Sequence, residues 1–192
     1  MHKQRLEAFS DGVIAVLITI MVLELHAPEK GEWRALEEPF WKGFLAYVLS
    51  FVFLGIYWNN HHHMLHTAER VNGRILWANL HLLFWLSLVP FTTSWLGKHS
   101  SEGTPTAFYG VVLLLAAAAY TLLQAAIVAQ QGPHSRLAAA VGKDRKGKVS
   151  MLAYALAIPL AFARPWLADA LYVFVALLWL VPDRRIESKL TA

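Results

Sequence analysis

The feature that most constrains this chain is a charged segment that leads directly into a long apolar stretch. An R-x-x-x-F-S-D segment, Arg5 to Asp11, is followed at once by the stretch Gly12 to Leu23, in which Thr19 is the only polar residue. A helix of this length can enter a bilayer, whose hydrocarbon core needs roughly 20 apolar residues. Charged side chains at membrane depth are costly and are usually retained for a purpose. We therefore expect Arg5 and Asp11 to belong to a functional or structural site.

The composition of the whole chain is that of a membrane protein. Hydrophobic residues make up 57% of its 192 residues and charged residues 16%, whereas a soluble domain carries about 25% charged residues. No cysteine is present, which excludes disulfides, thiolate metal sites and cysteine nucleophiles. We predict an all-α integral membrane protein in which residues 1–192 form a single domain. Its six predicted spans cover residues 6–26, 40–66, 75–96, 107–129, 149–163 and 166–182.

Basic residues are distributed unevenly between the two predicted membrane faces. The N-terminus, residues 67–74 and 130–148, and the C-terminus hold 12 of the 17 Lys and Arg residues. By the positive-inside rule, both termini are predicted to face the cytoplasm. The net charge of +4 follows from this orientation, and we predict no nucleic-acid binding. The basic loop from Lys143 to Lys148 fits either a solvated loop or a contact with anionic lipid headgroups.

Helical periodicity divides the first predicted span into two faces. At about 100° per residue, Asp11 lies almost opposite the face on which the apolar residues gather. A pore lined by the apolar face could not also be lined by Asp11. A buried carboxylate needs partners, so we expect Asp11 to face neighbouring helices. The residues of the opposite face are Gly12, Val16, Thr19, Ile20 and Leu23.

Polar residues in the second and third predicted spans are available partners for Asp11. Trp58 and His61 are three positions apart and share a helix face, and Asn79 lies in the third span. Indole and imidazole N–H groups donate hydrogen bonds to carboxylates, and an amide both donates and accepts. Together with Arg5, these side chains are predicted to form an interhelical hydrogen-bond cluster that stabilises the bundle.

The histidines of the second span raise the alternative of a metal site. His62 and His66 are four positions apart, as in the histidine motifs of membrane di-iron oxygenases and zinc proteases, but position 63 is His where those proteases need Glu. Ser10 lacks the nucleophile elbow of a hydrolase. We therefore predict no catalytic residue, no metal, no resident cofactor and no enzyme activity. A histidine-bound metal enzyme stays an alternative, as does a secondary transporter, although the two related halves typical of transporters are not evident.

These residues resemble the signature of the transmembrane protein 175 potassium-channel family. The resemblance rests on the R-x-x-x-F-S-D segment that ends at Asp11, on Trp58-x-x-His61, and on Asn79 followed by Val89-Pro90-Phe91. It covers the first three spans well and the others by hydropathy alone. Prokaryotic members are single six-helix units that assemble as tetramers. The resemblance thus implies a homotetrameric, multi-pass potassium channel in a prokaryotic cell membrane, with lipids and potassium ions as its partners.

The resemblance also implies roles for individual residues. The first helix of each unit in that family lines a central pore that has no carbonyl filter. The principal hydrophobic constriction corresponds to Val16, a threonine linked to selectivity to Thr19, and a further apolar layer to Leu23. Because Val16 is smaller than the family's usual Ile or Leu, Ile20 or Leu23 is an alternative for the narrowest ring. The interior network that holds the first three helices in register corresponds to Arg5, Phe9, Ser10, Asp11, Trp58, His61 and Asn79.

A mechanism follows from these assignments as a hypothesis. Apolar rings exclude a hydrated cation when narrow, because they offer nothing to replace its hydration shell, so gating is expected to be widening and wetting. The Thr19 hydroxyl either offers its oxygen to a partly dehydrated potassium ion or bonds back to a backbone carbonyl one turn earlier. Glu24 either concentrates cations at the outer mouth or is an exposed interfacial carboxylate. Proton conduction through the same pore is an alternative to potassium conduction.

Overall fold

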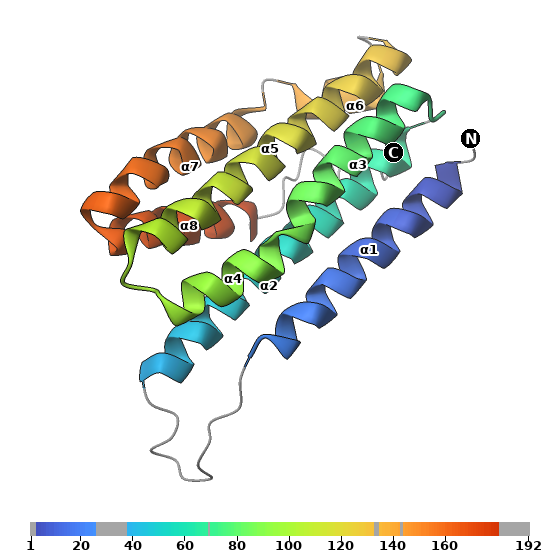
Figure 1. The fold of residues 1–192 in the computed structure, drawn as a ribbon. Coiled ribbons are helices and arrows are strands. Elements are labelled where there is room, and N and C mark those ends of the chain that lie inside the picture. The colour runs from blue at the N-terminus through green and yellow to red at the C-terminus, as the bar shows by residue number, and fades with distance from the viewer. Residues whose placement is uncertain (1–2, 26–37, 69, 133–134, 143, 181–192) are drawn as a thin grey trace.

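The computed structural model describes residues 3–25, 38–68, 70–132, 135–142 and 144–180 (Figure 1). Every regular element within these ranges is a helix, which confirms the all-α prediction. The helices are α1 (Lys3–Leu23), α2 (Glu38–Thr67), α3 (Gly73–Ser87), α4 (Val89–Lys98), α5 (Gly103–Gln131), α6 (Arg136–Val141), α7 (Arg145–Ala163) and α8 (Pro165–Leu180).

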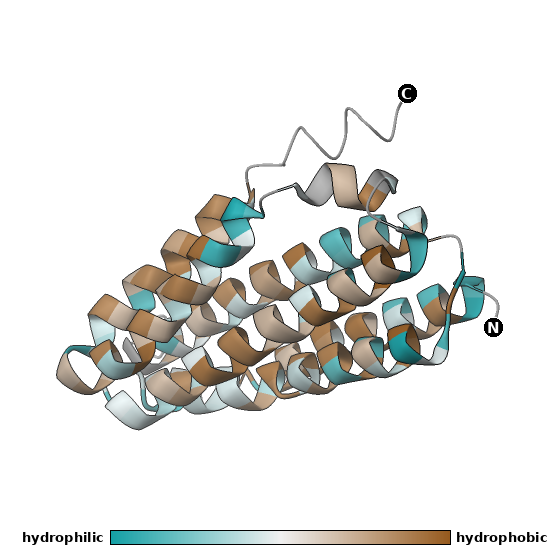
Figure 2. Cartoon of the chain, turned by 90° about the horizontal axis from the view of Figure 1, so that it is seen from above, coloured by the Kyte–Doolittle hydropathy of each residue, from teal (hydrophilic) through white to brown (hydrophobic). Residues whose placement is uncertain are grey.

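Five helical segments in the described ranges are long and apolar enough to cross a membrane. They are Lys3–Leu23, Phe40–Thr67, Gly73–Lys98, Gly103–Gln131 and Arg145–Ala163. Hydrophobic residues prevail along the bodies of the helices (Figure 2). The sixth predicted span corresponds to α8, which is apolar but has 16 residues. Residue 26 of the first predicted span and residues 181–182 of the sixth lie outside the described residues.

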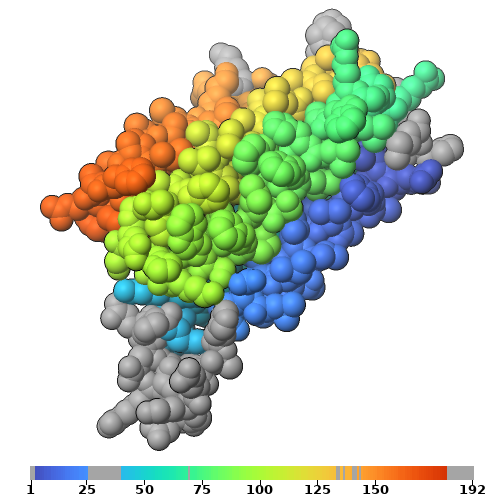
Figure 3. Space-filling model, in the orientation of Figure 1, coloured from blue at the N-terminus to red at the C-terminus, as the bar shows by residue number. Residues whose placement is uncertain are grey.

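The helices form a bundle in which α1 occupies one edge and the α7–α8 hairpin the opposite edge (Figures 1 and 3). The long helix α5 runs between them and contacts α3, α4, α7 and α8. The edge helix α1 packs against α2, α3 and α4. One face of α1 is therefore buried in the bundle, and the rest of its surface is open in the single subunit.

Local sequence signals account for several helix ends. The Asn72 side chain caps α3 by accepting a hydrogen bond from the Ile75 N–H at 2.9 Å. Asp144 caps α7 from a left-handed backbone conformation, φ 39°, that aspartate tolerates better than most residues. The α7–α8 hairpin turns at Arg164, whose extended backbone is the conformation favoured before a proline, and Pro165 then opens α8.

The third predicted span is one membrane segment built from two helices. The span predicted over residues 75–96 is present, and it contains a break at Leu88 that separates α3 from α4 and that the sequence analysis did not predict. Pro90 lies in the first turn of α4 and has no N–H to give to the carbonyl four residues earlier, so a helix start is the position where it is tolerated. Hydropathy does not reveal this break, because the residues around it are as apolar as those of an unbroken helix.

Two clusters of buried residues hold the bundle together. The first joins α1, α2, α3 and α5 and includes Ile14, Leu54, Leu82 and Leu123. The second joins α2, α5, α7 and α8 around Tyr109 and Tyr172, whose rings meet edge to face with their centroids 5.3 Å apart.

Helices α2 and α4 cross closely at a pair of glycines. A Cβ atom added to Gly97 would lie 2.9 Å from the Cα atom of Gly43. Small residues allow this backbone approach, which is a common way of packing helices in membranes. The crossing holds α4, the second helix of the third span, against α2.

Candidate functional site

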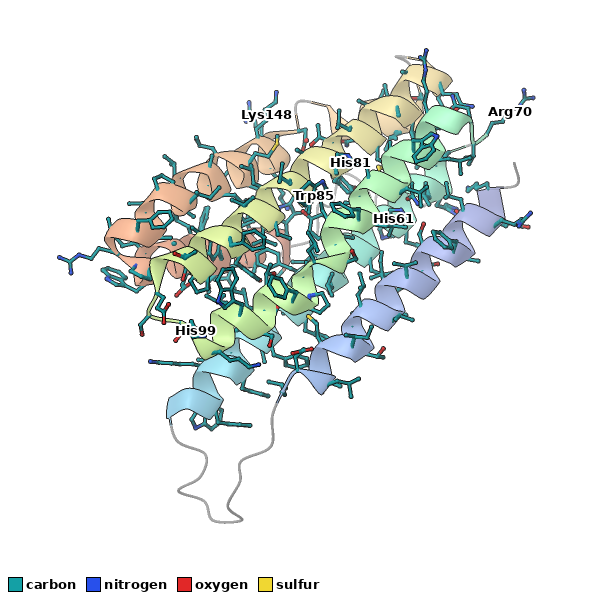
Figure 4. All side chains as sticks on the ribbon, in the orientation of Figure 1. His61, Arg70, His81, Trp85, His99 and Lys148 are labelled. Atoms are coloured by element: carbon teal, nitrogen blue, oxygen red, sulfur yellow. The ribbon has the colours of Figure 1, made fainter. Side chains whose placement is uncertain are left out.

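A chain of buried hydrogen bonds joins α1, α2 and α3. His61 on α2 contacts Asn79 on α3 through its Nε2 atom, 2.7 Å from the Asn79 Oδ1 atom. The Asn79 Nδ2 atom donates to the Ser10 Oγ atom on α1 at 3.0 Å, and the Ser10 hydroxyl donates to the Leu6 carbonyl at 2.9 Å. Figure 4 shows His61 in the space between α1 and α3. The three side chains are almost completely buried.

The direction of each bond in this chain is fixed by its chemistry. The Asn79 Oδ1 atom can only accept, so His61 must carry a proton on Nε2. The Asn79 amide then donates to Ser10, and the Ser10 hydroxyl donates its only proton to the backbone carbonyl of Leu6 on α1. The His61 Nδ1 atom is buried and has no hydrogen-bond partner among the described residues. This chain of hydrogen bonds joins three helices, and its last acceptor is the Leu6 backbone carbonyl of α1.

Asp11 is held by a separate bond beside this chain. The Trp58 Nε1 atom on α2 donates to the Asp11 Oδ1 atom at 3.1 Å. Asp11 is half-buried and Trp58 is exposed on the surface of the single subunit. Asp11 therefore faces α2, away from the apolar face of α1, and its carboxylate gains a fixed donor.

Arg5 and Phe9 lie outside the hydrogen-bonded cluster in the single subunit. Both side chains are exposed on α1, and no ion pair between Arg5 and Asp11 occurs among the described residues. The cation that does reach α2 is Lys3, whose Nζ atom donates to the His66 carbonyl at 2.6 Å. A cation at the C-terminal end of a helix is favourable to its dipole. Sequence reasoning missed this contact because it joins a side chain to a backbone group.

The face of α1 that was predicted to line a pore is open in the subunit. Val16 is 53% exposed, Ile20 is 40% exposed and Leu23 is 77% exposed. Gly12 and Thr19 are exposed on the same side. The opposite side is buried in the bundle through Leu6, Ser10, Ile14, Leu17 and Met21. An apolar strip of this kind on an edge helix requires a cover of lipid or of another protein surface.

The Thr19 hydroxyl donates to the Val16 carbonyl of its own helix at 2.8 Å. A backbone bond of this kind is the alternative to a role of Thr19 in selectivity. The bond uses the hydroxyl proton and leaves the oxygen lone pairs unoccupied. Because Thr19 is exposed, its oxygen can still accept from water or coordinate a cation. Glu24 is also exposed and follows the last turn of α1.

The histidines at the end of α2 stack along one side of the helix. The rings of His62 and His66 are 6.2 Å apart between centroids and nearly parallel, and Trp58 stacks on His62. Within the described part of the chain, no group of three or more His, Asp or Glu side chains is placed to hold a metal ion.

A second buried polar cluster was not predicted from the sequence. The Thr93 hydroxyl on α4 donates to the Ser50 Oγ atom on α2 at 2.7 Å, and Ser50 shares a hydrogen bond with the Tyr109 hydroxyl on α5 at 2.9 Å. All three side chains are buried. The sequence does place these hydroxyl side chains inside three apolar spans. It does not indicate which of them form hydrogen bonds with one another.

The part of the chain that carries the three-helix cluster matches a known family model. The model of the endosomal/lysosomal potassium channel TMEM175 matches residues 5–90. A potassium channel of Chryseobacterium sp. (strain P1-3) is 51% identical over 190 residues, which are 99% of this chain and 98% of that protein. The endosomal/lysosomal proton channel TMEM175 of Homo sapiens is 31% identical over 96 residues, 44% of this chain and 19% of that protein.

The fold is similar to that of a solved channel. The crystal structure of a lysosomal potassium-selective channel TMEM175 homolog from Chamaesiphon minutus superposes with a TM-score of 0.78 at 25% identity. The superposition covers 93% of this chain and 96% of that chain.

Proposed function

The chain belongs to the TMEM175 potassium-channel family, a family of membrane ion channels rather than enzymes, and we propose that it conducts potassium across a prokaryotic cell membrane. The protein is a homotetramer of six-helix units with both termini in the cytoplasm, α8 is the sixth span, and α1 lines the pore. The observation that carries this proposal is the open apolar face of α1, opposite the face that the bundle buries.

The constriction is formed by apolar side chains of α1 from four subunits. Val16, Ile20 and Leu23 are exposed on one side of this helix, at positions one turn apart. Rings of such side chains give an ion no replacement for its hydration shell, so a narrow ring stays dry and closed and a wider ring wets and conducts. The channel has no carbonyl-type filter and no resident cofactor, and potassium is its permeant ion.

Selectivity is supplied by the Thr19 hydroxyls. The bond from each hydroxyl to the Val16 carbonyl turns the oxygen lone pairs away from the helix. Four such oxygens replace part of the hydration of a potassium ion, and the apolar rings beside them keep other water away. Glu24 raises the local concentration of cations at the outer mouth.

The hydrogen-bonded cluster holds α1 at the correct angle for this pore. The bonds of Asn79 and Trp58 reach Ser10 and Asp11, two successive residues of α1 at the start of its apolar run. Positioning residues of this kind set the register of the pore face, and they do not touch the permeant ion.

The test is ion flux from purified protein in liposomes. A potassium gradient with an impermeant counter-ion is imposed, valinomycin gives the maximal signal, and the assay is repeated with sodium. Potassium flux above sodium flux is expected. Val16→Asn and Leu23→Asn, which make the rings wettable, are each expected to raise the basal flux several-fold. Absence of potassium flux from well-folded oligomers, or unchanged flux in both variants, would contradict the proposal.

Proton conduction is the second candidate, because the human relative is named a proton channel. The chain of bonds through Asn79 is a poor proton path, since an amide cannot pass on a proton as a hydroxyl can. Protons would instead follow water in the pore. A pH-sensitive dye inside the same liposomes separates the two ions: acidification without potassium flux favours a proton channel.

A further inference from the structure

Two polar side chains on the outer surface of the subunit have no role in the proposed pore. Asn59 on α2 and His81 on α3 are both exposed. Each lies two residues from a member of the buried contact between His61 and Asn79. Two residues correspond to about 200° of rotation around a helix, so a residue two positions from an inward-facing one points outwards. Figure 4 shows His81 on the side of α3 opposite His61.

Both side chains lie at the same predicted depth in the membrane. Asn59 is eight residues before the end of α2, and His81 is eight residues after the start of α3, which is about 12 Å along each helix. The membrane segments that contain them have 28 and 26 residues, so each is about 40 Å long and exceeds a hydrocarbon core of about 30 Å. The excess is about 5 Å at each end, and both side chains therefore lie inside the apolar layer.

Polar groups at this depth need a partner, because lipid tails form no hydrogen bonds. The Trp85 Nε1 atom donates to the His81 Nε2 atom at 2.9 Å. A neutral imidazole that accepts through Nε2 carries its proton on Nδ1. His81 thus offers an N–H donor on the outer face of α3, and Asn59 offers an amide oxygen acceptor on the outer face of α2.

Large apolar side chains accompany both polar groups. On α3, Trp77 is 75% exposed and Phe84 is 54% exposed, each within about one turn of His81. On α2, the exposed Val48 lies on the same face as Asn59, about three turns away. Lipid covers such apolar side chains as well as protein does, so the polar groups decide between the two covers.

The two outer faces flank α1, the helix proposed to line the pore. Helix α1 contacts both α2 and α3, and in Figure 1 α3 lies in front of α2 with α1 beside both. In a ring of four copies with α1 at the centre, each subunit meets the next through two different faces. The outer face of α2 in one copy then meets the outer face of α3 in the next. All copies lie at one depth, so the acceptor of one copy meets the donor of its neighbour.

We propose that His81 of each subunit donates a hydrogen bond from Nδ1 to the Asn59 Oδ1 atom of the next subunit. This inference rests on the homotetramer proposed above and adds the faces through which its subunits meet. The partner on each face is a second copy of this chain, held by one interhelical hydrogen bond and by the apolar side chains around it. Four such bonds close the ring around α1.

Cross-linking of paired cysteines tests this interface in a chain that has no cysteine. Asn59→Cys and His81→Cys are combined in one chain, and the protein in liposomes is treated with a short bifunctional thiol reagent. We expect dimer, trimer and tetramer bands on a denaturing gel, because a head-to-tail ring links every copy to two neighbours. Each single variant should give a monomer band. The control pair is Asn59→Cys with Leu152→Cys, since Leu152 is exposed at a similar depth on α7, at the edge opposite α1.

A second measurement tests the hydrogen bond itself. In native mass spectrometry, Asn59→Leu and His81→Leu should each weaken the tetramer about threefold per interface. The double variant should be no weaker than the weaker single one, because both changes remove the same bond. Asn59→Leu should leave unfolding of the subunit little changed, because Asn59 is exposed on it.

The outcomes separate this interface from the proposed channel. A tetramer that gives no cross-link in the test pair, an equal cross-link in the control pair, or additive losses in the double variant would overturn the interface and leave the channel proposal standing. Cross-links from Asn59→Cys alone would mean that two copies of α2 meet, which also overturns it. A monomer in liposomes would contradict the proposed tetramer as well.

Discussion

Asn79 is the residue on which the alignment of three helices depends. Its amide oxygen accepts from His61 on α2 and its amide nitrogen donates to Ser10 on α1. No other side-chain type of this size offers both functions in one plane. The sequence indicated that Trp58, His61 and Asn79 face one another. It paired them with Asp11, whereas only Trp58 contacts that carboxylate. Ser10 and Asp11 are adjacent on α1, and periodicity shows which residues face the bundle but not which donor each of them meets.

Replacement of this amide should cost stability. Asn79→Leu keeps a side chain branched at Cγ but leaves His61 and Ser10 without their interhelical partners, so we expect a loss of about 1–3 kcal/mol in the free energy of unfolding. Thermal unfolding in detergent measures it. Asn59→Leu, at an exposed position of α2, is the matched control and should change the midpoint little. Equal midpoints for both variants would argue against a stabilising cluster.

Thr19 is expected to act through its oxygen alone. Thr19→Val keeps the shape of the side chain and removes the hydroxyl, so the ratio of potassium to sodium flux should fall towards one. Thr121→Val is the control, because the Thr121 hydroxyl makes the same kind of backbone bond, to Ala117 at 2.9 Å, on a helix outside the proposed pore. A ratio that falls in neither variant, or in both, would remove Thr19 from selectivity.

At the scale of elements, hydropathy and turn signals predicted most of the helices. The segments that contain α1 to α5, α7 and α8 were predicted, because a long apolar run is typical of a membrane-spanning helix. The break at Leu88 was not expected, and neither was the glycine crossing of α2 and α4. Both features depend on which helices pack against each other, and the residues of a single helix do not indicate its neighbours.

The glycine crossing makes a prediction of its own. Gly97→Ala places a methyl group against the Gly43 backbone, so the helices must separate, and we expect a loss of about 1–3 kcal/mol. Gly55→Ala, whose new Cβ atom would meet nothing within 4 Å, should be neutral or stabilising, because alanine favours helices. Unfolding midpoints of the two variants give the comparison. A more stable Gly97→Ala protein would mean that α2 and α4 do not pack at this point.

At the scale of the whole molecule, the two sides of the bundle differ in how their helices are packed. The edge helix α1 has one side held by buried hydrogen bonds and the other side open, whereas α5, α7 and α8 pack together through buried residues that include several tyrosines. Helical periodicity was sufficient to predict the two sides of α1. The proposal that other subunits cover its open side, and that this side lines a pore, is therefore tested by function.

The most direct test uses the absence of cysteine from the sequence. Single cysteines are introduced at Thr19 on the proposed pore face, at Met21, which is 1% exposed, and at Val22, which is exposed but lies off that face. Potassium flux from liposomes is measured before and after a membrane-impermeant cationic thiol reagent. We predict that only Thr19→Cys is blocked. Block of Val22→Cys without block of Thr19→Cys would contradict the claim that this face of α1 lines the ion pathway.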